Sequence, residues 1–323
     1  MDIAGRRIMV TGAAGHVGGH IIEHILREQP REIIALDRTF GGGESESPCL
    51  VGSPLVNKVE CNITDAETLR KLTVGVDVIV HAAGQLSRDV AANLRNGFEV
   101  NIGGTFNLIE AAVKAGVRRV VFTSSSSVYD GRIWPRAIVE ADAYDPSSLY
   151  GAGKSAGEML LRVFHAASGL EYVSLRCSTI YGMRQSRRSN TARLIPESFE
   201  RIQNGLAPIV YGDGTASYDF IDVHDVARAH VRAIKSSVRA GAYNIATGRS
   251  VSVADVARFV AETAGFHGPL EFSAQGDRNN IPTHVFDVKK AELELGFKAE
   301  ITLQKGLQNY HTWLKRNVQR PLQ

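Results

Sequence analysis

The sequence predicts an α/β protein built on a Rossmann-type, doubly wound parallel sheet. Two observations support this fold class. Apolar runs typical of buried strands alternate with segments of helical periodicity, as expected for parallel strands joined by helices. A glycine-rich turn also separates the first apolar run from the first helical segment. The apolar runs cover residues 8–10, 33–36, 58–61, 76–81, 117–123 and 172–176.

The first turn has the spacing Gly-x-x-Gly-x-x-Gly, followed by a predicted helix over residues 17–26. Glycines there let the backbone approach a pyrophosphate, whose charge is stabilised by the N-terminus of the helix. The turn therefore predicts a dinucleotide site. Its expected contacts are Gly12, Gly15, His16, Val17 and Gly18.

An acidic residue, Asp37, follows the second apolar run about twenty residues further on. A carboxylate at this place hydrogen-bonds the adenosine ribose and repels a 2′-phosphate, which favours NAD. The neighbouring Arg38 is the kind of residue that an NADP site uses, so the two residues favour different cofactors. We predict NAD, with both residues at the ribose.

The chain is expected to form two interleaved parts. Residues 1–177 form the predicted NAD-binding Rossmann domain, to which a segment at about 220–245 returns as a helix and a short strand. After residue 178 the regular alternation gives way to loops with Gly and Pro. Residues 178–323 are therefore expected to form mostly a smaller α/β substrate-binding domain. Ligands should meet at the carboxyl ends of the strands.

Composition excludes several function classes. The chain has 37 basic and 34 acidic residues, which gives a net charge of +3. The sequence has no extended basic patch, so nucleic-acid binding is not expected. No run of eighteen apolar residues or export signal is recognisable, so we expect a cytoplasmic protein without a membrane span. The three cysteines have no metal-ligand spacing and are expected to be reduced. His16, His81 and His224 show no zinc spacing either, so no metal is predicted.

A Tyr-x-x-x-Lys motif opens a predicted helix over residues 150–165. Tyr150 and Lys154 are then one turn apart on the same face. A nearby ammonium favours the phenolate, so Lys154 is expected to lower the pKa of Tyr150 and make it an acid or base for a substrate hydroxyl. A serine run, 124–127, follows the fifth strand and offers a hydroxyl that would share the proton.

With these motifs in order, the chain resembles the extended short-chain dehydrogenase/reductase family. Within that family it is similar to the nucleotide-sugar epimerases and dehydratases, such as UDP-glucose 4-epimerase. The resemblance covers nearly the whole chain. Besides the motifs above, it rests on Asn62-Ile63, His81 to Gly84, Asn101 to Thr105, Tyr181-Gly182, Tyr211 to Gly214 and Asp222 to Val226.

The resemblance implies roles for individual residues. Ser125, three positions before Val128, would be the catalytic hydroxyl, although its serine neighbours could take that place. Tyr150 would be the base, and Lys154 would also bind the nicotinamide ribose. A homodimer is implied through helices at 97–115 and 150–165. Further cofactor contacts implied are Asn62 and Ile63 at the adenine, the backbone of Ala82, Ala83 and Gly84, and Asn101 as a support near the site.

The predicted reaction is epimerisation of a nucleotide sugar by transient oxidation to a ketone. The family's dehydratases carry an Asp-Glu pair where this chain has Ser126 and Ser127, so dehydration is disfavoured. A dehydrogenase or reductase that releases its cofactor and acts on a sugar or another secondary alcohol is the alternative. A regulatory protein that only senses a dinucleotide would normally lack the Tyr and Lys.

Two departures from the family pattern concern the substrate. Tyr218 replaces an arginine that commonly holds the diphosphate, which removes a charge-assisted contact to phosphate. Thr179 stands where many members have asparagine. Loop arginines 184, 187, 188 and 193 could take over the diphosphate, or the substrate carries no nucleotide. The predicted substrate-binding residues are Ser126, Thr179, Arg187, Tyr218 and Arg278.

Overall fold

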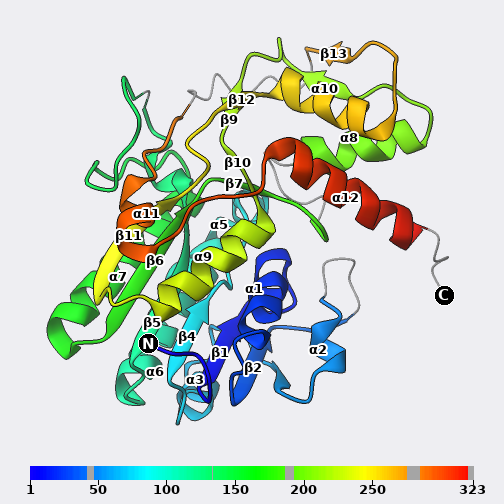
Figure 1. Cartoon of the computed structure of the whole chain (residues 1–323). Helices are drawn as coiled ribbons and strands as arrows, with labels where there is room; N and C mark the ends of the chain where they lie inside the picture. Colours follow the sequence, from blue (N-terminus) through cyan, green and yellow to red (C-terminus); the bar gives the residue numbers. More distant parts are fainter. Residues whose placement is uncertain (42–46, 133, 186–192, 275–283, 319–323) are drawn as a thin grey trace.

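The computed structural model describes residues 1–41, 47–132, 134–185, 193–274 and 284–318. Its centre is a seven-stranded parallel sheet in the order β3-β2-β1-β4-β5-β6-β11 (Figure 1). The order runs outward in both directions from β1, as in a doubly wound sheet. This confirms the predicted fold class. The strands are β1 (Arg7–Thr11), β2 (Glu32–Asp37), β3 (Val56–Glu60), β4 (Val78–His81), β5 (Arg119–Ser125), β6 (Glu171–Cys177) and β11 (Ala240–Ile245).

Helices cover both faces of this sheet. Alternate side chains of a strand point to opposite faces. In β1, Ile8 and Val10 pack with apolar residues of α1 and α9, whereas Met9 packs with those of α3, α6 and α7. The helices beside the sheet are α1 (His16–Leu26), α2 (Cys49–Gly52), α3 (Ala66–Leu72), α4 (Ser87–Ala92), α6 (Thr105–Lys114), α7 (Leu149–Ser168), α9 (Val223–Lys235) and α11 (Lys289–Leu295).

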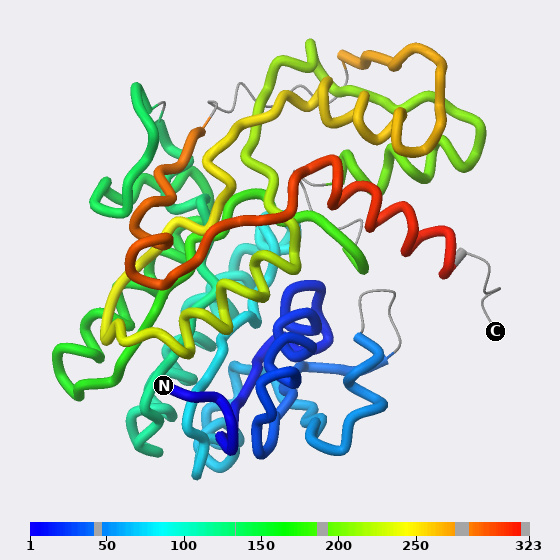
Figure 2. The backbone as a smooth tube through the Cα atoms, in the orientation of Figure 1, coloured from blue at the N-terminus to red at the C-terminus, as the bar shows by residue number. Residues whose placement is uncertain are grey.

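The chain leaves the sheet after β6 and comes back to it. Strand β7 (Thr179–Tyr181) pairs with β10 (Phe220–Asp222) outside the main sheet. Helix α9 then lies alongside α1, and β11 pairs with β6 as the edge strand (Figure 2). Segments far apart in the sequence are thus joined in one layered unit.

A second layer lies above the sheet in the view of Figure 1. Its apolar core is formed by side chains including Phe199, Val256, Val260 and Leu307. No helix among the described residues combines the length and apolar character needed to cross a bilayer. The elements of this layer are α8 (Leu194–Gln203), β8 (Ile209–Tyr211), β9 (Ser217–Tyr218), β12 (Val251–Ser252), α10 (Val253–Ala264), β13 (Glu271–Ser273) and α12 (Leu303–Val318).

The helix expected over residues 97–115 is continuous, but its middle is π-helical and not α-helical. The structure has α5 (Leu94–Phe98), a π-helical segment η1 (Glu99–Gly104) and then α6. The wide turn carries Asn101, whose Oδ1 accepts from the Gln85 N–H at 2.7 Å and whose Nδ2 donates to the Gln85 carbonyl at 3.0 Å. The π-helical segment therefore fastens the loop after β4, which periodicity alone does not reveal.

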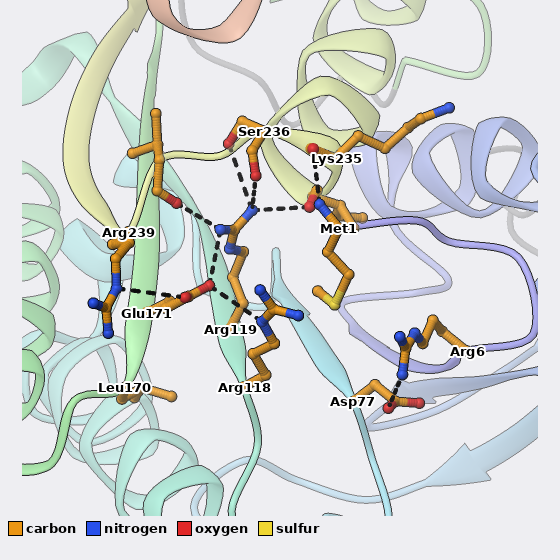
Figure 3. A network of polar contacts seen from close by, with 12 residues as sticks. Met1, Arg6, Asp77, Arg118, Arg119, Leu170, Glu171, Lys235, Ser236 and Arg239 are labelled. Carbon is orange, nitrogen blue, oxygen red and sulfur yellow. Dashed lines mark hydrogen bonds and ion pairs between the residues drawn. The ribbon is translucent and has the colours of Figure 1, made fainter.

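A buried arginine joins the amino ends of β5 and β6 to the end of α9 (Figure 3). The Arg119 side chain is 1% exposed, and its Nη2 donates to Glu171 at 2.8 Å. Its Nη1 donates to three carbonyl oxygens, of Ala233, Ile234 and Ser236, at 2.8 to 2.9 Å. Carbonyls at the end of a helix have no partner within the helix. The guanidinium supplies these missing donors.

Replacing Arg119 with Met should therefore destabilise the protein by about 3 kcal/mol or more, because buried carbonyls and Glu171 lose their donors. Urea unfolding measures this loss. The control is Arg118→Met, since the Arg118 side chain is 56% exposed and lies 3.6 Å from the same carboxylate; about 1 kcal/mol or less is expected there. Equal losses in the two variants would contradict the assignment.

Candidate active site

A cavity of about 750 Å³ opens at the carboxyl ends of the parallel strands. This is the edge at which doubly wound sheets bind ligands. Asn101 fastens its wall without lining it, and Arg187 and Arg278 lie outside the described residues. The predicted residues that line the cavity are Gly12, Gly15, His16, Val17, Gly18, Asp37, Arg38, Asn62, Ile63, Ala82, Ala83, Gly84, Ser125, Ser126, Tyr150, Lys154, Thr179 and Tyr218.

The glycine turn is packed too closely for side chains. Gly12 has φ +71°, and a Cβ there would lie 2.7 Å from the Ala83 backbone N. A Cβ at Gly18 would lie 2.0 Å from the Gly12 carbonyl O. Helix α1 follows without a side-chain hydrogen bond at its cap residue, Gly15. Backbone N–H groups at a helix start bind phosphate, so this cradle fits a pyrophosphate.

Asp37 ends β2 on the same wall. Its carboxylate accepts from the Ala14 N–H at 2.9 Å and from the Arg38 N–H at 2.8 Å. Burial raises the pKa of Asp37, and these hydrogen bonds oppose the rise. The carboxylate is thus fixed between the glycine turn and the start of the next loop. That placement fits the ribose of a dinucleotide, with Asn62 and Ile63 on the adjoining wall.

The four serines after β5 have different surroundings. Ser124 donates to the buried carboxylate of Glu158, so its hydroxyl is already engaged. The Ser127 side chain opposes the rise that burial causes in the pKa of Asp130. Ser125 accepts from the Ser127 N–H at 3.1 Å, and its hydroxyl opposes the rise in the pKa of Tyr150. Among the serines, Ser125 is therefore the one whose side chain acts on the tyrosine.

Helix α7 presents Tyr150 and Lys154 to the cavity. It begins after Ser148, whose side chain accepts from the Gly151 N–H at 3.1 Å, and it ends at Gly169 in the left-handed region. The Lys154 Nζ donates to the Thr123 carbonyl O at 2.7 Å. The same Nζ lies 5.8 Å from the centre of the Tyr150 ring.

The expected lowering of the tyrosine pKa is not found in this arrangement. Burial raises the pKa of Tyr150 to about 12, and the Ser125 hydroxyl opposes this rise only in part. Burial also lowers the pKa of Lys154 to about 8. The reason for the difference is that the ammonium faces the Thr123 carbonyl, while loss of water dominates at the phenol.

The cavity is also lined by residues that the sequence analysis did not select. Asp130 follows the serine run and His284 comes from the segment before α11. Their side chains approach to 3.6 Å. Asp130 stands where the family pattern Ser-x-x-Val-Tyr-Gly has glycine, and that departure was the available signal. Others on the wall include Gln85, Asp89, Cys177 and Ser178.

Two of the four loop arginines, Arg184 and Arg193, lie in the described part of the chain. Arg184 donates to Glu23 on α1 at 2.7 Å, and Arg193 pairs with Glu197 at 3.1 Å. Neither lines the cavity. Arg188, like Arg187, lies outside the described residues. Within the described part of the chain, no group of three or more His, Cys, Asp or Glu side chains could hold a metal ion.

Comparison with known proteins gives consistent matches. Residues 8–246 match the family described as "NAD dependent epimerase/dehydratase family". UDP-glucose 4-epimerase of Bacillus subtilis is 30% identical over 343 residues, covering 96% of this chain and 97% of the relative. dTDP-glucose 4,6-dehydratase of Streptomyces griseus is 29% identical, covering 96% and 94%. The structure of Thermus thermophilus UDP-glucose 4-epimerase in complex with NAD is 29% identical, with a TM-score of 0.84, covering 96% and 99%.

The lowered pKa of Lys154 predicts a pH dependence of stability. The unfolded chain, with the ordinary value of 10.5, binds more protons than the folded chain between pH 8 and 10.5. The free energy of unfolding should therefore rise with pH across this window. Relative to a Lys154→Met variant, the unsubstituted protein should gain about 3 kcal/mol. Urea unfolding at several pH values measures the gain, and parallel pH profiles would contradict it. Lys114→Met, at an exposed lysine, is the control.

Proposed function

Because the chain belongs to the NAD-dependent epimerase/dehydratase family, we propose that it is a nucleotide-sugar epimerase that transiently oxidises one sugar carbon to a ketone. The observation that carries this proposal is that Ser125, Tyr150 and Lys154 line one cavity, where the Ser125 side chain opposes the rise in the pKa of Tyr150. Serines at 126 and 127 lack the proton capacity that elimination of water requires. The first observation supports transient oxidation, and the second favours epimerisation over dehydration.

The cofactor is assigned to the wall formed by the glycine turn, Asp37 and the loops after β3 and β4. NAD supplies a hydride acceptor and donor when it is bound. Residues 1–177, with the returning segment at about 220–245, are assigned to cofactor binding. Residues 178–323 are assigned mostly to the substrate, with Ser126, Thr179 and Tyr218 at its contacts. The roles of Arg187 and Arg278 belong to the same proposal.

The proton chemistry is assigned to the chain's own side chains. Tyr150 takes the proton of the substrate hydroxyl and returns it, while Ser125 holds the substrate oxygen and the phenol in line. Lys154 also binds the nicotinamide ribose. Because burial favours the neutral phenol, positive charge near the ring must accompany proton removal.

A dehydrogenase that releases its cofactor is the second candidate. Tyr218 lines the cavity where the family commonly has a diphosphate-binding arginine. This observation favours a sugar or another secondary alcohol without a nucleotide, since no guanidinium comes from that position. The same Ser125, Tyr150 and Lys154 would serve it.

The purified protein should be incubated with UDP-, dTDP-, GDP- and CDP-sugars, with and without NAD. Sugar products and the absorbance of NADH are followed together. Epimer formation without net NADH is expected. Net formation of NADH, or activity only on a free sugar, would contradict the epimerase proposal and favour the dehydrogenase.

Replacing Tyr150 with Phe should reduce turnover by about 10²-fold or more, because the phenol oxygen that moves the proton is lost. Binding of NAD should stay within about twofold, since the glycine turn is untouched. Initial rates and NAD titration give the two readouts. The matched control is Tyr211→Phe, at an exposed tyrosine that bonds Glu197 outside the cavity. Full activity in Tyr150→Phe would refute the role of this residue.

An apolar surface over α5, α6 and α7 supports the proposal of a homodimer. Phe106 and Phe164 bring their rings to 5.8 Å across α6 and α7. Large apolar side chains exposed on these helices would be covered by a second copy related by twofold symmetry. They are Leu94, Phe98, Phe106, Met159 and Val163, each at least 41% exposed.

The substitution Val163→Lys should separate the two copies of the homodimer, because it would bury a charge in an apolar contact. Light scattering of the unsubstituted protein should give about twice the 35.1 kDa of one chain. Val163→Lys should shift the mass toward one chain. Val74→Lys, at a valine 63% exposed after α3, should not. A monomer before substitution would exclude the homodimer.

A further inference from the structure

Asp130 is held firmly on the substrate side of the cavity. It directly follows Val128 and Tyr129, which are both fully buried. The Nδ1 of His284 lies 3.6 Å from its Oδ1, and the Ser127 side chain opposes the rise that burial causes in the pKa of Asp130. The imidazole in turn has its Nε2 3.3 Å from the Arg132 carbonyl O. The His284 imidazole thus holds one side of the carboxylate, and 29% of the Asp130 side chain stays exposed.

The charge of Asp130 acts on two tyrosines that line the same cavity, Tyr150 and Tyr218. Burial is the main cause that raises the pKa of both Tyr150 and Tyr218, and the charge of Asp130 adds to the rise in each. Tyr150 comes from α7 beside the sheet, whereas Tyr218 comes from β9 in the second layer. Asp130 therefore lies near the space between the two layers.

The charges of the described residues around this space are unbalanced. Among the described residues that line the cavity, the Lys and Arg side chains are Lys154, which donates to Thr123, and Arg38, beside Asp37 at the ribose end. The acidic ones away from that end include Asp89, Asp130 and Asp219. Asp219 is buried and accepts from Thr247 and Arg249 backbone N–H groups. Asp130 is the one of these three carboxylates whose charge acts on both Tyr150 and Tyr218.

We propose that Asp130, positioned by His284, determines substrate specificity by selecting nucleotide sugars with a neutral hexose over nucleotide uronates. This inference rests on the proposed function. An ionised carboxylate only accepts hydrogen bonds, and hexose hydroxyls are donors. A substrate carboxylate in the same space would be repelled by the Asp130 carboxylate. It would also lose hydrating water, which weakens its binding further. The hydroxymethyl and carboxylate forms of one hexose are similar in size, so charge decides between them.

The test compares UDP-glucose, UDP-glucuronate and UDP by titration calorimetry on the full chain with NAD. Tyr150→Phe is present in every sample so that turnover is slowed by about 10²-fold or more during the titration. UDP-glucose should bind at least about tenfold more tightly than UDP-glucuronate. Adding Asp130→Asn should bring the two affinities within about threefold, chiefly by improving UDP-glucuronate. UDP should bind alike with and without the Asp130 substitution.

The matched control is Asp145→Asn, which removes a nearby carboxylate that pairs with Arg132 and does not line the cavity. It should leave the discrimination unchanged. Asp130→Ser serves as a second variant should the amide variant lose its affinity for UDP. Equal affinities for UDP-glucose and UDP-glucuronate before the Asp130 substitution would overturn this inference. An unchanged difference between the two affinities after the substitution would overturn it as well. Neither result would affect the proposed function. If no UDP-, dTDP-, GDP- or CDP-sugar binds, and none of the four free nucleotides binds either, the nucleotide-sugar proposal fails, and this inference fails with it.

Discussion

The buried ion pair between Arg176 and Glu158 is the interaction on which the geometry of the active site depends. Arg176 lies on β6 and Glu158 on α7, and their side chains are 3% and 2% exposed, with Nη2 2.7 Å from Oε2. Two isolated charges at such depth would be strongly destabilising, so the surrounding hydrogen bonds are essential. Ser124 and Tyr144 donate to the carboxylate, and the guanidinium also bonds Tyr129.

This network links the three segments that carry Ser125, Asp130 and the pair Tyr150 and Lys154. Ser124 precedes Ser125 on β5, Tyr129 precedes Asp130, and Glu158 lies one turn beyond Lys154 on α7. Fixing these three backbones relative to β6 fixes the position of Ser125 relative to Tyr150. Buried polar networks of this kind favour one arrangement, because any other leaves a charge without its partner.

The cofactor side is built on a different principle. That side is formed mainly by backbone atoms. The glycine turn, the end of β4 and the start of α1 approach too closely for a Cβ at Gly12 or Gly18. The substrate side is formed by side chains from both layers, including Tyr218 and His284. One wall therefore presents fixed N–H groups, and the other can vary its charge and shape. This division accounts for a cofactor that is shared across the family and for substrates that differ among its members.

The sequence by itself determined the parallel sheet, the glycine turn and the presence of Tyr150 and Lys154 on one helix face. These features depend on local periodicity and on contacts between residues close in the chain. Tertiary structure alone decided where Lys154 donates and how the π-helical segment at Asn101 holds Gln85. It also brought Asp130 next to His284, more than 150 positions away. Burial and long-range contact govern these outcomes, and neither is encoded in a short run of residues.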